Sequence, residues 1–365
     1  MTRMKKWIHV GVFVVLLAVL LAWYFSDGRP AVTGLFRNGS YGTQMELDSS
    51  FSYAAGKYNG GVAVCGKNSI VGINNGGRKA WEVEFSATVP ILSCNGRYVL
   101  AAEQGGRKLL LLSGGRVRYE METREEIITA SVNSKGVFAV VSEERGYKGC
   151  VRVYNSKGNE LYAWHSAEQN ILTAAVSEDS KKLAVSVANM TDLSRVCTVL
   201  QFDMDETTPR MLTVGDENLT ANLVYNGTEL TAIGDEALYY FKSDGTEKFR
   251  LDYAGRELQK YSFYSGGVLC LCFKGGQSGG ASSVEFYDSN GKMKGSCMVD
   301  EAVSALDTFG TYAVVTTQSG FLIVSQNGAV RARRDEGISA ERIFMCGGRN
   351  RLFLLSGISA GMYIF

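Results

Sequence analysis

The sequence predicts an all-β fold, an eight-bladed β-propeller preceded by a single N-terminal transmembrane helix. Three observations lead to this prediction. A hairpin unit recurs along the chain, a second short motif alternates with it, and copies are about 40 to 45 residues apart, the period of a four-stranded propeller blade. The 3 prolines and 42 glycines agree with a chain of strands and turns.

The chain begins with a candidate membrane anchor. Residues 7–25 form a run of 19 residues without a formal charge, which as a helix spans about 28 Å, close to the hydrocarbon thickness of a bilayer. Arg3, Lys5 and Lys6 precede it, so residues 1–6 are predicted to be a cytoplasmic tail of a single-pass cell-membrane protein. The alternative is a cleaved signal peptide, whose apolar core is usually shorter and ends at a small-residue site.

The rest of the chain is predicted to lie outside the cell. Residues 26–40 are small and polar with Gly and Pro, which is typical of a tether. Residues 41–365 are predicted to form the propeller ectodomain.

The repeated unit is a β-hairpin. In the copy from Ser283 to Cys297, apolar residues alternate with polar ones, a turn follows at Asp288 to Gly291, and a second alternating run leaves it. Alternation places one face of each strand in a core, and the Asn-Gly pair is expected to supply the positive φ of a tight turn. Further copies occupy residues 70–85, 109–121, 151–164, 198–214, 237–251 and 321–331.

A second motif, ending in Ala, interleaves with the hairpins just before a strand. Small residues suit the innermost strand of a blade, where space is shortest. The copies are Glu126–Ala130, Asn170–Ala174, Asn218–Ala221, Ala302–Ala305 and Gly337–Ala340.

The end of the chain predicts how the ring closes. Residues 341–346, 351–355 and 361–365 match three strands of a blade whose outer strand is missing. Residues 41–47 are expected to supply that strand, because an open edge would expose unpaired backbone groups. This gives eight blades; seven is the alternative, if residues 197–214 are an insertion.

Propeller connectivity assigns the longer loops to one face, together with the connections between blades. Long loops on a rigid scaffold are where binding usually resides, whereas solvated loops without a partner are the alternative. The candidate contact residues are Arg145, Tyr147, Met190, Asp192 and Arg195.

Acidic residues precede successive inner strands on the same face. They are expected to ring the mouth of the central channel, where clustered carboxylates attract a cation or a basic peptide; ordinary polar loops are the alternative. The sequence contains no Asp-x-Asp-x-Asp spacing, which would indicate a dedicated calcium loop. The candidate residues are Glu126, Glu168, Glu217, Glu257, Glu301 and Glu336.

The sequence lacks the parts of the common catalytic sites. Of its 2 histidines, His9 lies in the apolar run and His165 ends an outer strand, a position typical of a surface residue. Neither a His-Glu-x-x-His pair nor a phosphate loop is present. We therefore expect that the protein is not an enzyme and that it has no catalytic or metal site.

The 8 cysteines lie mostly in apolar strand runs. Their even number outside a membrane invites disulfides, but a free cysteine is a small and well-buried core residue. Mostly free, buried thiols are expected.

The charge balance limits the classes of partner that the protein can bind. The chain has 38 Lys and Arg against 37 Asp and Glu, so it lacks the basic footprint of a nucleic-acid-binding protein. We expect a non-catalytic binding or scaffolding module at the cell envelope, with a protein, peptide or wall-polymer partner. The alternative is a quinone- or metal-dependent oxidoreductase with a site at the channel mouth.

Two of the units also resemble a known blade. Residues 70–81 and 237–249 each combine an apolar strand with a turn of Asn or Asp and Gly, and the first ends on Lys79 and Trp81. This pattern resembles the quinoprotein-like (PQQ-like, WD40-like) β-propeller repeat. The whole chain resembles a family of membrane-anchored propellers of unknown function from Gram-positive bacteria. The resemblance implies a scaffold; the residues that hold a quinone cofactor have no matching positions, so no cofactor is expected.

Overall fold

The computed structural model describes residues 40–46, 52–190, 195–215, 217–264, 268–275, 280–335, 340–348, 350–356 and 359–364. One compact unit comprises Tyr41–Tyr363. The predicted anchor at residues 7–25 lies outside the described residues. Within the described part of the chain, no helix is long and apolar enough to cross a membrane.

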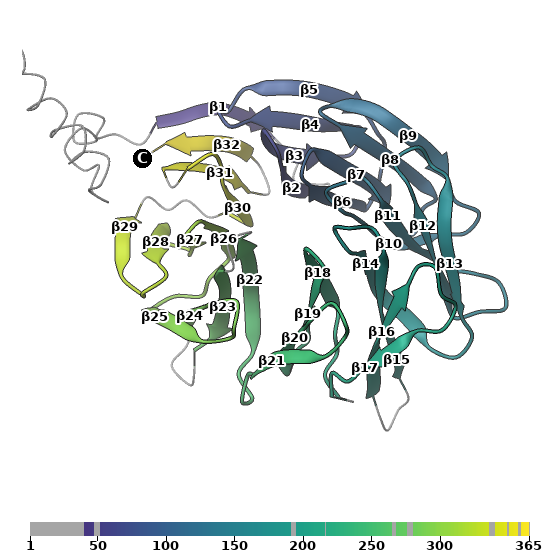
Figure 1. Cartoon of the computed structure of the whole chain (residues 1–365). Helices are drawn as coiled ribbons and strands as arrows, with labels where there is room; N and C mark the ends of the chain where they lie inside the picture. Colours follow the sequence, from purple (N-terminus) through teal and green to yellow (C-terminus); the bar gives the residue numbers. More distant parts are fainter. Residues whose placement is uncertain are drawn as a thin grey trace, which may run out of the picture. The chain divides into compact units, whose positions relative to one another are not determined.

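The unit Tyr41–Tyr363 is an eight-bladed β-propeller of four-stranded antiparallel sheets, which confirms the predicted fold class. Figure 1 shows the blades following one another in chain order around a common centre. Blades 1 to 4 are β2 (Ala54–Tyr58), β3 (Gly61–Cys65), β4 (Ser69–Asn74), β5 (Lys79–Glu84); β6 (Pro90–Asn95), β7 (Tyr98–Glu103), β8 (Lys108–Ser113), β9 (Arg116–Glu122); β10 (Ile127–Val132), β11 (Phe138–Ser142), β12 (Gly149–Tyr154), β13 (Glu160–Ser166); and β14 (Asn170–Val176), β15 (Lys182–Met190), β16 (Arg195–Asp203), β17 (Arg210–Leu212). Blades 5 to 8 are β18 (Asn222–Asn226), β19 (Glu229–Ile233), β20 (Ala237–Phe241), β21 (Glu247–Asp252); β22 (Leu258–Tyr264), β23 (Val268–Lys274), β24 (Ser282–Tyr287), β25 (Met293–Val299); β26 (Ala305–Phe309), β27 (Tyr312–Thr316), β28 (Phe321–Ser325), β29 (Val330–Arg334); and β30 (Arg342–Met345), β31 (Arg351–Leu355), β32 (Ser359–Ile364) with β1 (Ser40–Glu46).

The ring closes as the sequence predicted. Blade 8 has the order β1-β32-β31-β30, so the first strand of the chain is the outer strand of the last blade. Figure 1 shows β1 beside β32. Residues 197–214 belong to β16 and β17 of blade 4 rather than to an insertion, which excludes the seven-bladed alternative.

The turn in the clearest repeat differs in detail from the prediction. The Gly291 amide donates to the Asp288 carbonyl (3.0 Å), and the Asp288 amide donates to the Lys292 carbonyl (3.0 Å). Only Gly291 has a positive φ, 76°, and Asn290 does not. The loop is therefore a three-residue turn that ends on a left-handed glycine, not a two-residue Asn-Gly turn. The Asp288 carboxylate accepts the amides of Asn290 and Lys292, which explains why an acidic or amide residue starts this turn.

The hydrophobic core lies between neighbouring blades. Strands β3, β11 and β28 are buried at every position because both of their faces pack against an adjacent sheet. One cluster joins Leu109 and Leu111 of blade 2 to Phe138 and Val140 of blade 3. The outer strand β13 instead alternates between half-buried and exposed residues. Packing between blades thus fixes each sheet against the next.

A carboxylate near the centre ties the closing blades together. Both oxygens of Asp307 in β26 accept from Lys57 Nζ of β2 at 2.7 Å. Its Oδ2 also accepts the buried amide of Met345 in β30 at 2.7 Å, and its Oδ1 accepts from Ser262 Oγ of β22 at 3.3 Å. One side chain therefore bonds to blades 1, 6 and 8 from blade 7.

All 8 cysteines are free thiols, six of them buried. Burial raises the pKa of the Cys65 and Cys346 thiols to about 12. The cysteines accordingly act as small core residues.

Candidate functional site: the groove between blades 2 and 3

A polar groove separates blade 2 from blade 3. Its outer part is a cavity of about 430 Å³ between β9 and the sheet β11–β13. A second hollow of about 440 Å³ shares Glu122 and Arg124 with it and continues to the loop before β10. Both hollows together are called the inter-blade groove below. Its lining includes Glu103, Arg107, Glu122, Arg124, Glu126, Ser142, Arg152, Glu160 and His165.

Strand register places the polar side chains in this groove. Cys150 of β12 lies directly opposite Ser142 of β11 and His165 of β13, so the three share one face of the sheet. Arg152, two residues along β12, shares that face. At the other end of the same face, Tyr154 stacks on Phe138 with ring centroids 5.3 Å apart. The interface is thus apolar at its turn end and polar at its loop end.

The loop between β11 and β12 carries Glu144 back over the sheet. Backbone hydrogen bonds hold it, from Tyr147 N to Glu144 O (3.1 Å) and from Lys148 N to Ser166 O (2.7 Å). Gly146, with φ 81°, supplies the left-handed turn. The loop is therefore fixed to β13 and positions the Glu144 side chain above Cys150.

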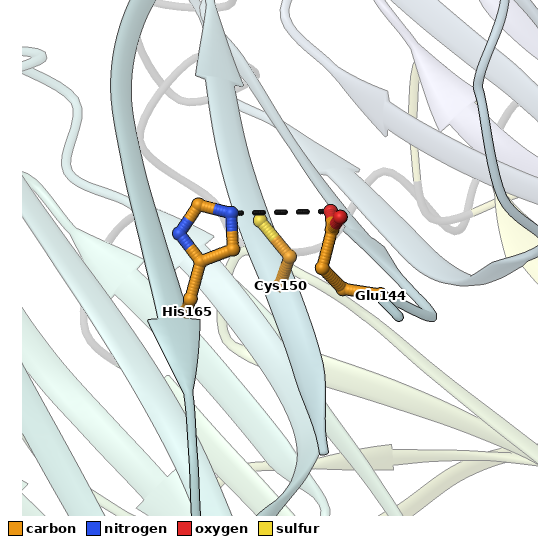
Figure 2. A group of neighbouring side chains, drawn as sticks. All are labelled: Glu144, Cys150 and His165. Atoms are coloured by element: carbon orange, nitrogen blue, oxygen red, sulfur yellow. Dashed lines mark ion pairs between the residues drawn. The ribbon is translucent and has the colours of Figure 1, made fainter. Parts of the chain in front are cut away.

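Glu144, Cys150 and His165 converge. Figure 2 shows the three side chains pointing toward one another, with a dashed line from His165 to Glu144. His165 Nε2 is 3.9 Å from Glu144 Oε2, and one ligand atom from each residue lies within 4.8 Å of the others. Arg152 Nη2 donates to Glu144 Oε2 at 2.7 Å and holds the pKa of Glu144 below its usual range. Burial raises the pKa of the Cys150 thiol to about 11.

Two predicted contact residues stand at the lip of the groove. The Tyr147 ring lies over His165 with centroids 5.0 Å apart, and Tyr147 is 49% exposed. The Arg145 side chain is 93% exposed, and its Nε lies 3.5 Å from Glu125 Oε1. The structure thus places Arg145 and Tyr147 beside Glu144, which the sequence did not single out.

The other predicted contact residues lie elsewhere. Arg195, at the start of β16, pairs with Asp235 of blade 5 at 2.9 Å. Met190 ends β15, but its side chain and Asp192 lie outside the described part of the structure. Their role stays a prediction.

Two of the predicted acidic residues, Glu257 and Glu301, bind neighbours within their own blades. Glu257 pairs with Lys274 at 3.0 Å. Glu301 accepts the amide of Ser319 at 3.0 Å and also its hydroxyl, and these hydrogen bonds lower the pKa of Glu301. Glu126 lines the groove, Glu168 and Glu217 are exposed, and Glu336 lies outside the described residues. None of the described ones belongs to a group of three potential metal ligands, and a functional ring stays a prediction.

An apolar cavity of about 350 Å³ on the opposite face is lined by residues of blades 2 to 6, with Tyr225, Phe249 and Phe263 in its wall. Its two carboxylates, Glu178 and Asp288, already have partners in the fold. Glu178 accepts from Asn95 Nδ2 at 2.7 Å and from the Ser134 amide, and Asp288 caps its own turn. The inter-blade groove is therefore the better candidate for a site that recognises polar groups.

Sequence reasoning missed Glu144, Cys150 and Arg152. A usable signal existed, because Cys150 and His165 flank a hairpin whose turn fixes which residues oppose each other. Glu144 had no such signal, since its place depends on how the loop folds back.

Comparisons with known proteins agree with the fold. BamB from Moraxella catarrhalis is 16% identical with a TM-score of 0.56 and covers 90% of this chain and 98% of that one. Sqt1 of Saccharomyces cerevisiae is 12% identical with a TM-score of 0.59, covering 90% and 99%. The C-terminal WD40 domain of Sif2 is 13% identical with a TM-score of 0.61, covering 90% and 98%. Identities this low show the fold alone.

No curated protein sequence matches the chain. One protein family does, over residues 36–359.

Proposed function

The chain belongs to DUF5711, a family of unknown function, and we propose that it is a non-catalytic binding module. Its propeller presents the inter-blade groove to a protein or peptide partner. One observation carries this proposal: a loop fixed by backbone hydrogen bonds holds Arg145 and Tyr147 exposed at the lip of the groove.

The chemistry of this lip fits protein recognition. Tyr and Arg dominate the energetics of protein interfaces because they offer large contact area with directed hydrogen bonds. The existing ion pair of Arg145 with Glu125 is weak, because its 3.5 Å separation is long and it is exposed to solvent, so it contributes little to stability. A carboxylate of the partner can therefore replace Glu125, while an apolar group packs on the Tyr147 ring. Two further arginines that line the groove, Arg107 and Arg124, extend the same preference.

The anchoring and the location form part of the proposal. The uncharged run at residues 7–25, with three basic residues before it, supports a single-pass anchor with a cytoplasmic N-terminus. The propeller then lies on the extracellular side of the cell membrane of a Gram-positive bacterium, tethered by residues 26–40. Protease treatment of intact cells tests this, because an extracellular propeller is degraded while a cytoplasmic one is protected.

Site-specific photo-crosslinking of the full chain in cells tests the binding role. A photo-reactive residue at position 147 is expected to give a discrete protein adduct, and Arg145→Ala is expected to reduce its yield. Two controls are matched by exposure: a photo-reactive residue at Met211 of blade 4, and Lys157→Ala on the opposite face of blade 3. Equal adducts from positions 147 and 211, or no protein adduct at 147, refute the proposal. A polysaccharide adduct would indicate a wall polymer instead.

A further inference from the structure

We propose that Glu144, Cys150 and His165 form a binding site for a borderline-soft divalent cation, with Zn²⁺ as the best-fitting ion. The sequence predicted no metal site, and the proposed partner binding does not require one. The site therefore stands or fails independently of the proposed function.

The three donors are the kinds that zinc prefers. Zn²⁺ binds cysteine sulfur, histidine nitrogen and carboxylate oxygen, and sites with three protein ligands keep a fourth position open. The hard cations Ca²⁺ and Mg²⁺ take oxygen ligands and are not suited to a thiolate and an imidazole. Within the described residues, this is the one group of three potential ligands whose donor atoms lie within 4.8 Å of one another.

The donor spacing is close to that of a tetrahedral site. Bond lengths of about 2.0 to 2.1 Å place a nitrogen and an oxygen ligand about 3.4 Å apart around zinc. His165 Nε2 and Glu144 Oε2 are 3.9 Å apart, so they need to approach by about half an ångström. Cys150 and His165 are held directly opposite each other on paired strands (Figure 2). The Cys150 sulfur lies within 4.8 Å of both other donors, whereas a tetrahedral zinc site holds it about 3.6 Å from them, so a rotation of the Glu144 side chain has to accompany metal binding.

The surrounding charges are compatible with a dication. Arg152 donates to one oxygen of Glu144, Oε2, as hydrogen-bonded partners of ligating carboxylates commonly do. The Arg152 charge is shared with Glu160, whose Oε2 lies 3.8 Å from Arg152 Nε. When the ion binds, it displaces the proton of the Cys150 thiol to solvent, and the resulting thiolate and Glu144 balance the two charges of the ion.

The site is also accessible. The His165 side chain is 36% exposed, so a cation can enter from solvent. Tyr147 covers one side of the imidazole and limits its rotation. The open fourth position would face the groove.

Titration of the full, untagged chain in detergent with Co²⁺ tests the proposal. One Co²⁺ is expected to bind, with a thiolate-to-cobalt charge-transfer band and tetrahedral d–d bands, and Zn²⁺ is expected to displace it. Cys150→Ser is expected to abolish the charge-transfer band. Glu144→Gln and His165→Gln are expected to weaken binding by at least about 10- to 100-fold, because even outer-shell changes cost that much. Cys297→Ser, a partly buried thiol of blade 6, is the matched control and is expected to change nothing.

Each alternative result overturns the site. A charge-transfer band that survives Cys150→Ser places the thiolate ligand elsewhere. Affinity unchanged by Glu144→Gln and His165→Gln shows adventitious binding, and absence of any binding of Co²⁺ or Zn²⁺ at millimolar concentration excludes the site directly. His165 is half-exposed, so its variant reports on the metal even where Cys150→Ser disturbs folding; circular dichroism of each variant establishes that it is folded.

Discussion

Removal of the Asp307 carboxylate should loosen the closure of the ring. In Asp307→Ala, the buried Met345 amide loses its acceptor, which costs about 2 kcal/mol. The ion pair with Lys57 is lost as well. It is intermediate between a surface and a buried pair, because the Lys57 side chain is 35% exposed and that of Asp307 only 7%, and contributes about 1 to 2 kcal/mol. We expect a total loss of about 3 to 4 kcal/mol in the free energy of unfolding.

Urea unfolding of the full chain measures this loss. Lys57→Met should also lower the midpoint, because it leaves the Asp307 carboxylate, 7% exposed, without its cation, but the Met345 amide keeps its acceptor. Lys79→Ala, which breaks an exposed ion pair with Glu82 in blade 1, should leave the midpoint nearly unchanged. A local readout accompanies the global one: hydrogen exchange of the Met345 amide should accelerate in Asp307→Ala and not in Lys79→Ala.

The account of Asp307 would be wrong if Asp307→Ala and Lys79→Ala shifted the urea midpoint equally. It would also be wrong if the Met345 amide exchanged at the wild-type rate in Asp307→Ala. The double variant Lys57→Met/Asp307→Ala supplies a further check. Its loss should be smaller than the two single losses added together, because the residues share one interaction.

Two further predictions concern turns and alkaline pH. Gly328→Ala should lower the urea midpoint at least twice as far as Gly105→Ala. Both glycines have a positive φ (84° and 71°), which costs an alanine about 1 kcal/mol. Only at Gly328 would the new Cβ also clash with a backbone atom, the carbonyl oxygen of Ser296. Equal shifts would contradict the turn geometry. The free energy of unfolding should fall as pH rises from about 9 to 12. In the unfolded chain the thiols of Cys65 and Cys346 ionise near about 8.5, whereas burial in the folded protein raises their pKa to about 12, so alkaline pH favours the unfolded state. The difference between the urea midpoints at pH 8 and pH 10 measures the effect, and Cys65→Ala should reduce this difference. An unchanged difference would show that the Cys65 thiol does not cause the pH dependence.

The blade architecture was predictable because its signals are local. Alternating apolar residues and turn residues recur every blade, and counting them left three strands at the C-terminal end and one near residue 41. These became β30, β31, β32 and β1 of blade 8. The detail of the turn was wrong for a physical reason: Asn-Gly is compatible with two turn types, and only the hydrogen bond from Gly291 to Asp288 distinguishes them.

The contacts of Asp307 were not predictable in this way. Lys57 and Asp307 are 250 residues apart, and neither stands in a motif. Asp307 is a polar residue in an otherwise ordinary strand of blade 7, and its role arises when the ring brings β2, β22 and β30 around it. Such contacts depend on the number of blades and on how they close, which local patterns do not encode.

The groove shows that a surface histidine can have neighbours that the sequence does not reveal. His165 was interpreted as a surface residue because no other histidine accompanies it in residues 41–365, and its side chain is indeed exposed. Strand pairing nevertheless sets it opposite Cys150, and a hydrogen-bonded loop brings Glu144 to both. Metal ligands need not be of one kind, so a search for pairs of one residue type overlooks sites of mixed donors. In a propeller, the loop between the second and third strands of each blade returns to the same end of that blade. A ligand set can therefore be assembled from one loop and two strands without any sequence motif.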